Sequence, residues 1–157
     1  MQVEDYLINH RGFDWPTILA EWAWLFPVQE FSIWLMNKYG DLFFVFDDDS
    51  VHMMDVGNGT LEKLAGSRDE FCDRIDEEDN ANNWLMIPLV DELAKIGKLL
   101  EPGRCYSFII PPALRGEYAV ENTATLNIRE HYGVYASIHH QIKDLPTGTK
   151  VRLRVKA

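Results

Sequence analysis

Apolar residues are concentrated around residues 40–60, and their pattern predicts the centre of a β-sheet. The five residues Leu42–Phe46 are all apolar and mostly aromatic or β-branched, and Gly40-Asp41 and Asp47 bound the run. A run of this length and composition is typical of a strand that is covered on both faces. The turn-forming residues 47–50 follow, then the loosely alternating run Val51–Val56 and the glycine-rich turn 57–59. The pattern therefore predicts two adjacent antiparallel strands near the middle of one sheet.

Other alternating runs supply further strands for this sheet. In Glu30–Asn37, alternation would place Phe31, Ile33 and Leu35 on one side, and Ser32, Trp34 and Met36 on the other. The segment Thr60–Ala65 fits either a short strand or a helical turn. Three more strands are predicted at Cys105–Ile110, Thr123–Ile128 and Val151–Val155.

Capping signals and helical spacing predict the helices. Asp14 can cap a helix that has Pro16 in its first turn, and Ile18, Leu19, Trp22 and Leu25 continue at helical spacing. Ser67 and Glu70 have the spacing of a capping box. In this motif the serine hydroxyl accepts a hydrogen bond from the backbone N–H of the glutamate, and the glutamate side chain accepts one from the backbone N–H of the serine. Further helices are expected over Val3–Ile8, from Pro88 to Gly97 with Leu89, Leu93 and Ile96 inward, and over Arg129–Asp144. Asn80–Asn83 and Ala113–Asn122 are expected to be loops.

These elements together predict the α+β class, with a mainly antiparallel sheet and helices over one of its faces. The chain has 157 residues and shows no repeat, linker or low-complexity tract, so residues 1–157 are expected to form a single domain.

The charge of the chain predicts the kind of partner. Fifteen Lys and Arg stand against 25 Asp and Glu, for a net charge of −10. Binding to phosphates requires clustered basic residues, so direct binding to nucleic acid or an anionic membrane is not expected, and a basic or neutral partner is favoured. Residues 67–79 hold two arginines and seven acidic residues, a net charge of −5. The candidate partner-binding residues are therefore acidic: Asp47, Asp48, Asp49, Asp76, Glu77, Glu78 and Asp79.

The sequence carries no recognisable catalytic motif. It has no nucleophile elbow, zinc-protease motif or dinucleotide fingerprint, and Gly148-Thr149-Lys150 lacks the context of a phosphate loop. His139 and His140 are consecutive on a helix, so they point about 100° apart and do not chelate one metal together. We therefore predict no catalytic residues, no metal and no cofactor.

The N-terminal residues and the cysteines predict a cytoplasmic protein. Met1–Asp5 is acidic and lacks the basic flank and apolar core of a signal peptide. The sequence contains no run of 18 apolar residues, so no membrane span is predicted. Cys72 and Cys105 are expected to be free thiols. The oligomeric state stays open.

The order and spacing of short motifs resemble those of a known family, over nearly the whole chain from about Phe13 to Val155. The motifs are Phe13-Asp14-Trp15, Gly40-Asp41-Leu42-Phe43, Ser50-Val51-His52, Asp55-Val56-Gly57, Gly59-Thr60-Leu61, Ser67-Arg68-Asp69-Glu70-Phe71, Trp84-Leu85-Met86, Pro111-Pro112-Ala113-Leu114, the segment 116–122, His139-His140-Gln141 and the segment 143–149. In these motifs the chain resembles the family of bacterial immunity proteins whose named members neutralise a DNase toxin of the type VI secretion system. The resemblance implies a non-catalytic protein that binds a toxin.

Three functions follow as hypotheses. The first is a cytoplasmic immunity protein that binds and neutralises a cognate toxin. The second is a regulatory or small-ligand-binding module, in which the aromatic N-terminal helix and the loop 111–122 would line an apolar pocket. The third is an enzyme whose site is assembled from distant residues. A closed pocket with convergent polar groups would favour the second, and a cleft with buried, pKa-shifted residues would favour the third.

Overall fold

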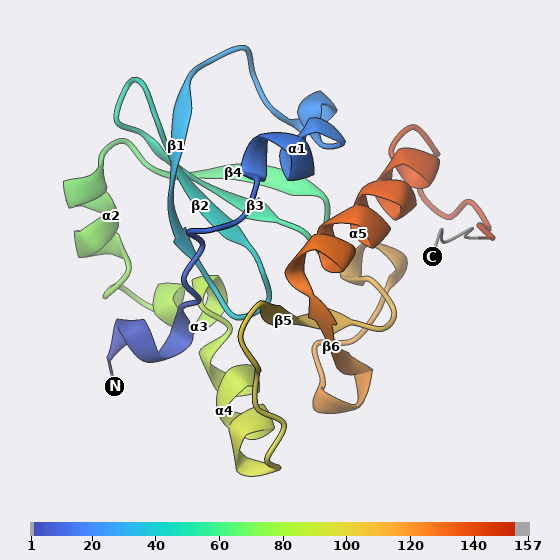
Figure 1. Cartoon of the computed structure of the whole chain (residues 1–157). Helices are drawn as coiled ribbons and strands as arrows, with labels where there is room; N and C mark the ends of the chain where they lie inside the picture. Colours follow the sequence, from blue (N-terminus) through green and yellow to red (C-terminus); the bar gives the residue numbers. More distant parts are fainter. Residues whose placement is uncertain (1, 153–157) are drawn as a thin grey trace.

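The computed structural model describes residues 2–152 and is built around one four-stranded sheet (Figure 1). Its strands are β1 (Phe31–Met36), β2 (Leu42–Phe46), β3 (Val51–Asp55) and β4 (Thr60–Ala65), in that order and all antiparallel. The predicted hairpin is thus at the centre of the sheet, and the ambiguous segment 60–65 is a strand. A second sheet pairs β5 (Arg104–Phe108) with β6 (Thr123–Asn127). The α+β class is confirmed.

Five α-helices surround the sheets in the described part of the chain. They are α1 (Trp15–Ala20), α2 (Arg68–Arg74), α3 (Asn80–Trp84), α4 (Ile87–Lys95) and α5 (Ile128–Ile142), and short 3-10 turns lie at Val3–Tyr6, Ala23–Leu25, Pro112–Leu114 and Val120–Asn122. The Asp14 side chain caps α1 as predicted, with Pro16 in the first turn. Ser67 caps α2, but Glu70 accepts a hydrogen bond from the Gly66 N–H, one residue before the expected donor.

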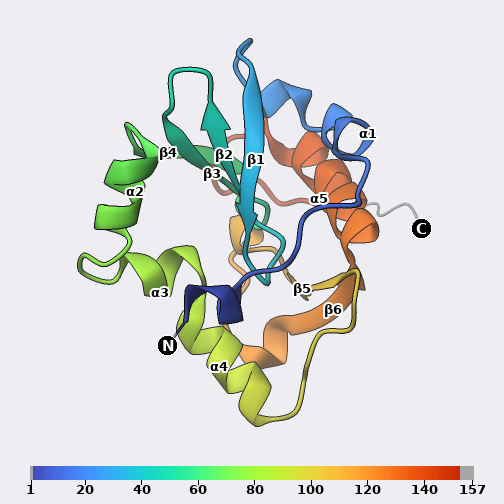
Figure 2. The same cartoon turned by 60° about the vertical axis from the view of Figure 1, so that its left-hand side comes forward.

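The expectation of helices over one face of the central sheet was wrong, because helices cover both (Figure 2). Phe43 and Met53 pack with the α2–α4 side, against residues such as Phe71 and Leu89. The opposite face carries Leu42, Phe44, Phe46 and Met54, which pack with α1 and α5 through Trp15, Leu19, Tyr132 and Tyr135. The all-apolar sequence of β2 follows from this double coverage, since each face of the strand meets a core.

A bulge in β1 overturns the simple alternation predicted for that strand. Ile33 pairs with Phe44 and Leu35 pairs with Phe43, so Trp34 is the extra residue. A bulge sends the following side chain to the other face of the sheet. Leu35 therefore packs with the α2–α4 core, whereas Ile33 stays with the α1–α5 core.

Four other local predictions were wrong or only partly tested. Residues 80–83, expected as a loop, begin α3, and Ile96, expected to be buried, is 64% exposed. The N-terminal helix is a 3-10 turn that ends at Tyr6. Val151 and Arg152 are not in a strand, and the rest of the predicted strand Val151–Val155 lies outside the described residues.

The loop between β5 and β6 is closed at its base by one side chain. Asn122 accepts a hydrogen bond from the Ile110 N–H (2.8 Å) and donates from Nδ2 to the carbonyls of Ile110 (2.9 Å) and Glu117 (2.8 Å). A Cβ at Gly116 would lie 1.7 Å from the Ile110 carbonyl oxygen, so only glycine fits there. The loop, whose only helical parts are the 3-10 turns Pro112–Leu114 and Val120–Asn122, is therefore held in one shape.

Candidate functional site: an acidic, aromatic-lined pocket

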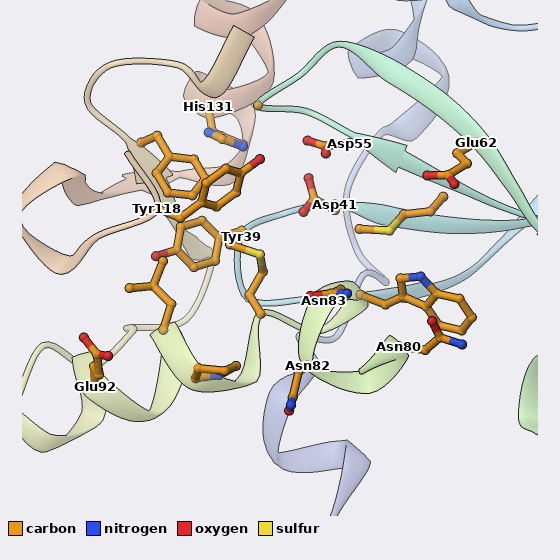
Figure 3. Close-up of a pocket in the computed structure, with 17 residues that line it drawn as sticks. Tyr39, Asp41, Asp55, Glu62, Asn80, Asn82, Asn83, Glu92, Tyr118 and His131 are labelled. Carbon is orange, nitrogen blue, oxygen red and sulfur yellow. The ribbon is translucent and has the colours of Figure 1, made fainter. Parts of the chain in front are cut away.

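A pocket of about 690 Å³ opens where the β2–β3 hairpin meets α3, α4 and the β5–β6 loop (Figure 3). Four carboxylates line it, those of Asp41, Asp55, Glu62 and Glu92, and no lysine or arginine does. Aromatic side chains and amides complete the wall, among them Tyr39, Trp84, Phe108, Tyr118, Asn80, Asn82 and Asn83. The volume lies within the range of about 300–1,000 Å³ that is usual for ligand sites.

Asn37 holds Asp41 at the inner end of the pocket. It is fully buried, and its Oδ1 accepts hydrogen bonds from the backbone N–H groups of Tyr39 and Asp41, which fixes the β1–β2 turn. Its Nδ2 donates to Asp41 Oδ2 (3.0 Å) and to the Trp84 carbonyl (2.9 Å). One side chain thus ties the turn, the Asp41 carboxylate and the end of α3 together.

Asp55 is held by the turn that follows β3. Its Oδ1 accepts from the Asn58 N–H (3.0 Å) and its Oδ2 accepts from Asn58 Nδ2 (2.9 Å). The same Nδ2 donates to the Tyr118 hydroxyl (2.9 Å), so Asn58 links the carboxylate to the β5–β6 loop. Asp55 is only partly buried and therefore stays accessible from the pocket.

The two aspartates make the pocket electrostatically unusual. Leu42 pairs with Met54. Asp41, just before Leu42, and Asp55, just after Met54, therefore lie at the same end of the hairpin, and their carboxylates face each other in Figure 3. Asp41 is 6% exposed; burial, and secondly the charge of Asp55, raise its pKa well above the usual value, against the smaller effects of its hydrogen bonds from Val56 and Asn37. Close carboxylates with a strongly shifted pKa are typical of functional sites, so this pair makes the pocket the candidate site.

His131 of α5 contributes a buried ring with one unused nitrogen. Its Nδ1 is 2.9 Å from Ser107 Oγ. Its Nε2 is buried and has no partner at full hydrogen-bond geometry within residues 2–152, although the Tyr39 backbone lies near the ring. Burial lowers the pKa of His131 to about 4, with a smaller opposing effect from the Tyr39 backbone, so the ring is neutral at physiological pH. The imidazole therefore brings an uncharged polar atom to the wall of an acidic pocket.

Other chemistry is limited in the described part of the chain. Residues 2–152 contain no group of three or more His, Cys, Asp or Glu side chains placed to hold a metal ion. Cys72 is exposed and Cys105 is buried, and both are free thiols. None of the helices described is long and apolar enough to cross a membrane.

The first predicted acidic segment, Asp47–Asp49, is a β-turn with local partners. Asp47 accepts from Gln29 Nε2 (2.5 Å), Asp48 accepts from the Ser50 N–H and hydroxyl, and Asp49 pairs with Arg68 (3.0 Å). Asp47 and Asp48 are exposed, whereas Asp49 is partly covered.

The second predicted segment, Asp76–Asp79, is exposed throughout and leads directly into α3. Because Arg68 begins α2 and residue 76 follows its end, the two acidic segments flank opposite ends of this helix. Residues 80, 82 and 83 of α3 line the pocket, so the Asp76–Asp79 segment adjoins the pocket rim. None of the seven predicted acidic residues lines the pocket itself.

The pocket was not predicted from the sequence, although a signal was present. The predicted hairpin places Asp41 before one strand and Asp55 near the end of the next, and antiparallel pairing brings these positions together. The expected pocket was apolar and lined by the N-terminal helix; the observed one is acidic, and α1 lies on the other face of the sheet. Only the expected contribution of the loop 111–122 was confirmed, through Tyr118.

The protein is acidic, has an α+β fold and carries an aromatic-lined acidic pocket, and one family match adds to this description. The model of the family "T6SS immunity protein Tdi1, C-terminal" matches residues 65–139, just under half of the chain. This match confirms the resemblance to the type VI secretion immunity protein family and supports toxin neutralisation as the general role. The matched segment runs from the end of β4 into α5 and includes the Asp76–Asp79 segment and most of the pocket wall. No curated protein matches the chain.

Proposed function

We propose that this protein is a cytoplasmic immunity protein that binds a cognate secreted toxin and neutralises it by protein–protein contact, without catalysis. The observation that carries the proposal is the family match over residues 65–139. We further propose that residues 1–157 act as one domain, without direct contact to nucleic acid or membrane.

The charge distribution supports a basic partner, and a nuclease is the toxin class to test first. An enzyme that acts on nucleic acid presents a basic cleft to phosphates, and an acidic protein can occupy that cleft. The exposed segment Asp76–Asp79, together with Asp47, Asp48 and Asp49, offers such a surface around α2.

Exposed apolar residues beside the pocket support a protein partner as well. Ile109 is 63% exposed, Ile110 is 54% exposed and Tyr118 is 56% exposed, and all three belong to the loop region after β5. Large exposed apolar groups with a polar surround are typical of protein-binding surfaces.

Co-expression tests the proposal. The neighbouring gene product is expressed in a bacterial host with and without this protein, and the complex is then isolated by pull-down. Toxicity that disappears with co-expression, together with a stable complex, is the expected result. A neighbouring product that is harmless, or a toxin that this protein neither binds nor suppresses, would contradict it.

The pocket also favours a second candidate, a small-ligand-binding module, because polar groups converge in it. The shifted pKa values of two buried residues, Asp41 and His131, are a feature that enzyme active sites often share. Both shifts favour the uncharged forms, and the family match supports binding rather than turnover, so the immunity proposal accounts for more of the molecule.

A further inference from the structure

We propose that the pocket binds the guanidinium group of an arginine side chain from the bound toxin, with N–H groups donated to Asp41, Asp55 and His131 Nε2. This inference rests on the proposed function for the source of the arginine. The cation-binding property itself belongs to the pocket and can be tested on this protein alone.

The electrostatics of the pocket select a cation. Four carboxylates and no basic side chain line it, and within residues 2–152 neither Asp41 nor Asp55 forms an ion pair. Each oxygen of the two aspartates accepts one hydrogen bond from Asn37, Val56 or Asn58, and a carboxylate oxygen has two lone pairs. Both side chains therefore keep acceptor capacity toward the pocket, and a bound cation would favour the ionised form of Asp41, which burial and Asp55 disfavour in the empty pocket.

The unused nitrogen of His131 is the independent observation that points to a ligand. Buried polar atoms are hydrogen-bonded in nearly all native structures, so an unpaired one calls for an explanation. When the Nδ1 proton is donated to Ser107 Oγ, Nε2 carries the lone pair and accepts a hydrogen bond from a bound N–H group. Figure 3 shows the ring reaching the same space as Asp41 and Asp55.

The shape and the walls favour guanidinium over other cations. A guanidinium has five N–H donors in one plane, which matches several acceptors at once, and it stacks on aromatic rings. Tyr39, Trp84, Phe108 and Tyr118 supply such rings. The volume of about 690 Å³ accommodates a whole arginine side chain with part of the chain that carries it.

The surroundings of the opening favour a protein as the source. The acidic segment Asp76–Asp79 adjoins the rim at α3, and the exposed Ile109, Ile110 and Tyr118 lie on the side of the β5–β6 loop. In protein–protein interfaces a few buried residues carry most of the binding energy. An arginine that enters the pocket between an acidic and an apolar surface would be such a residue.

The first test titrates this protein, without toxin, with ethylguanidinium and with its neutral isostere ethylurea, monitored by NMR. The expected result is saturable shifts of the His131 ring and Trp84 indole signals, with ethylurea at least tenfold weaker. Equal binding of the two probes, or shifts confined to other residues, would overturn the cation site.

Two variants keep this test independent of folding defects. Asp55→Asn should weaken ethylguanidinium at least tenfold, and the rim variant Glu62→Gln/Glu92→Gln, at two exposed positions, should weaken it severalfold. Asp69→Asn, an exposed position of α2 outside the pocket, is the matched control and should bind as the wild type does. Unchanged binding in both pocket variants would overturn the proposal.

A second arm identifies the source of the guanidinium. Once a cognate toxin is in hand, Asp55→Asn should weaken toxin binding at least tenfold, whereas Asp69→Asn should not, and bound toxin should displace ethylguanidinium. Toxin that binds Asp55→Asn as tightly as the wild type would overturn the arginine-anchor assignment. Failure to find any toxin would count against the proposed function and leave the probe titration as the independent result.

Discussion

The two faces of the central sheet are formed by the same strands but differ in structure. On the α1–α5 face, aromatic rings close the core: Trp22 is fully buried, donates its indole N–H to the Tyr132 carbonyl (3.2 Å) and meets the Tyr132 ring edge-on. On the α2–α4 face, the core formed around Phe43 and Phe71 gives way to the acidic pocket at one end of the hairpin. A single hairpin thus contributes to a closed core on one side and to an open pocket on the other.

The largest expected effect comes from the closed face. Phe44→Ala should lower the free energy of unfolding by about 3–5 kcal/mol, because the ring is fully buried against Phe26 and Phe31. Chemical denaturation measures this loss. Tyr118→Ala, at the exposed pocket rim, is the comparison and should lose far less. A loss below about 1 kcal/mol for Phe44→Ala would mean that this face is not a closed core.

The contact between the β3–β4 turn and α5 gives the next effect. Gly59 has φ +68°, and a Cβ there would lie 2.6 Å from His139 Nδ1. Gly59→Ala should therefore cost about 1–3 kcal/mol of stability.

Gly133→Ala is its matched control. A Cβ at this position in α5 meets nothing within 4 Å, so the change should stabilise the protein by about 0.5–1 kcal/mol. Similar thermal shifts for the two variants would show that the turn and the helix do not approach closely.

The buried His131, which lines the pocket, should make the stability of the protein depend on pH. Its pKa is lowered to about 4, so between the unfolded value of 6.5 and 4 the unfolded state binds more protons than the folded state. Stability therefore falls as the pH is lowered through this window, with a slope of up to about 1.4 kcal/mol per pH unit from this residue.

Asp41 acts in the opposite sense, because its raised pKa favours the folded state at low pH and that contribution is lost as the pH rises. Comparing denaturation curves of the wild type and His131→Gln across pH 4–7 isolates the histidine. The variant should show a shallower acid-side loss, and identical pH profiles would contradict a buried neutral ring.

The smallest effect on stability, but a clear one on binding, is expected from the exposed segment Asp76–Asp79. Asp76→Lys/Glu78→Lys should change stability by less than about 0.5 kcal/mol. If the segment steers a basic toxin, the association rate should fall at low salt and recover partly at high salt.

Glu101→Lys/Glu130→Lys makes the same change in net charge at exposed positions before β5 and in α5. It should slow association less. Equal slowing by the two double variants would mean that net charge, and not this segment, governs encounter.

The sequence predicted the parts of this molecule that depend on local chemistry. The Asp14 and Ser67 caps, the strand Leu42–Phe46 and the Gly57–Gly59 turn are set by neighbouring residues, and the structure confirms them. The misses depend on tertiary contacts. Three of the first four residues of α3 are asparagines and no side chain caps it, yet it forms where Trp84 stacks on Phe71.

The pocket depends on contacts of the same kind. Asp41 becomes a buried carboxylate only when α3, the hairpin and the β5–β6 loop enclose it, and no local pattern in the sequence records that enclosure. The bulge at Trp34 was missed for a related reason, since only pairing with β2 reveals the extra residue.

The Asn122 side chain that closes the β5–β6 loop has a consequence for how such proteins diversify. A loop whose shape is fixed at its base, by one amide side chain and the glycine at 116, can change the residues at its tip without disturbing the sheets below. Residues 113–115, 117 and 118 can therefore be exchanged to select or engineer new recognition, while Gly116 and Asn122 keep the loop in its shape.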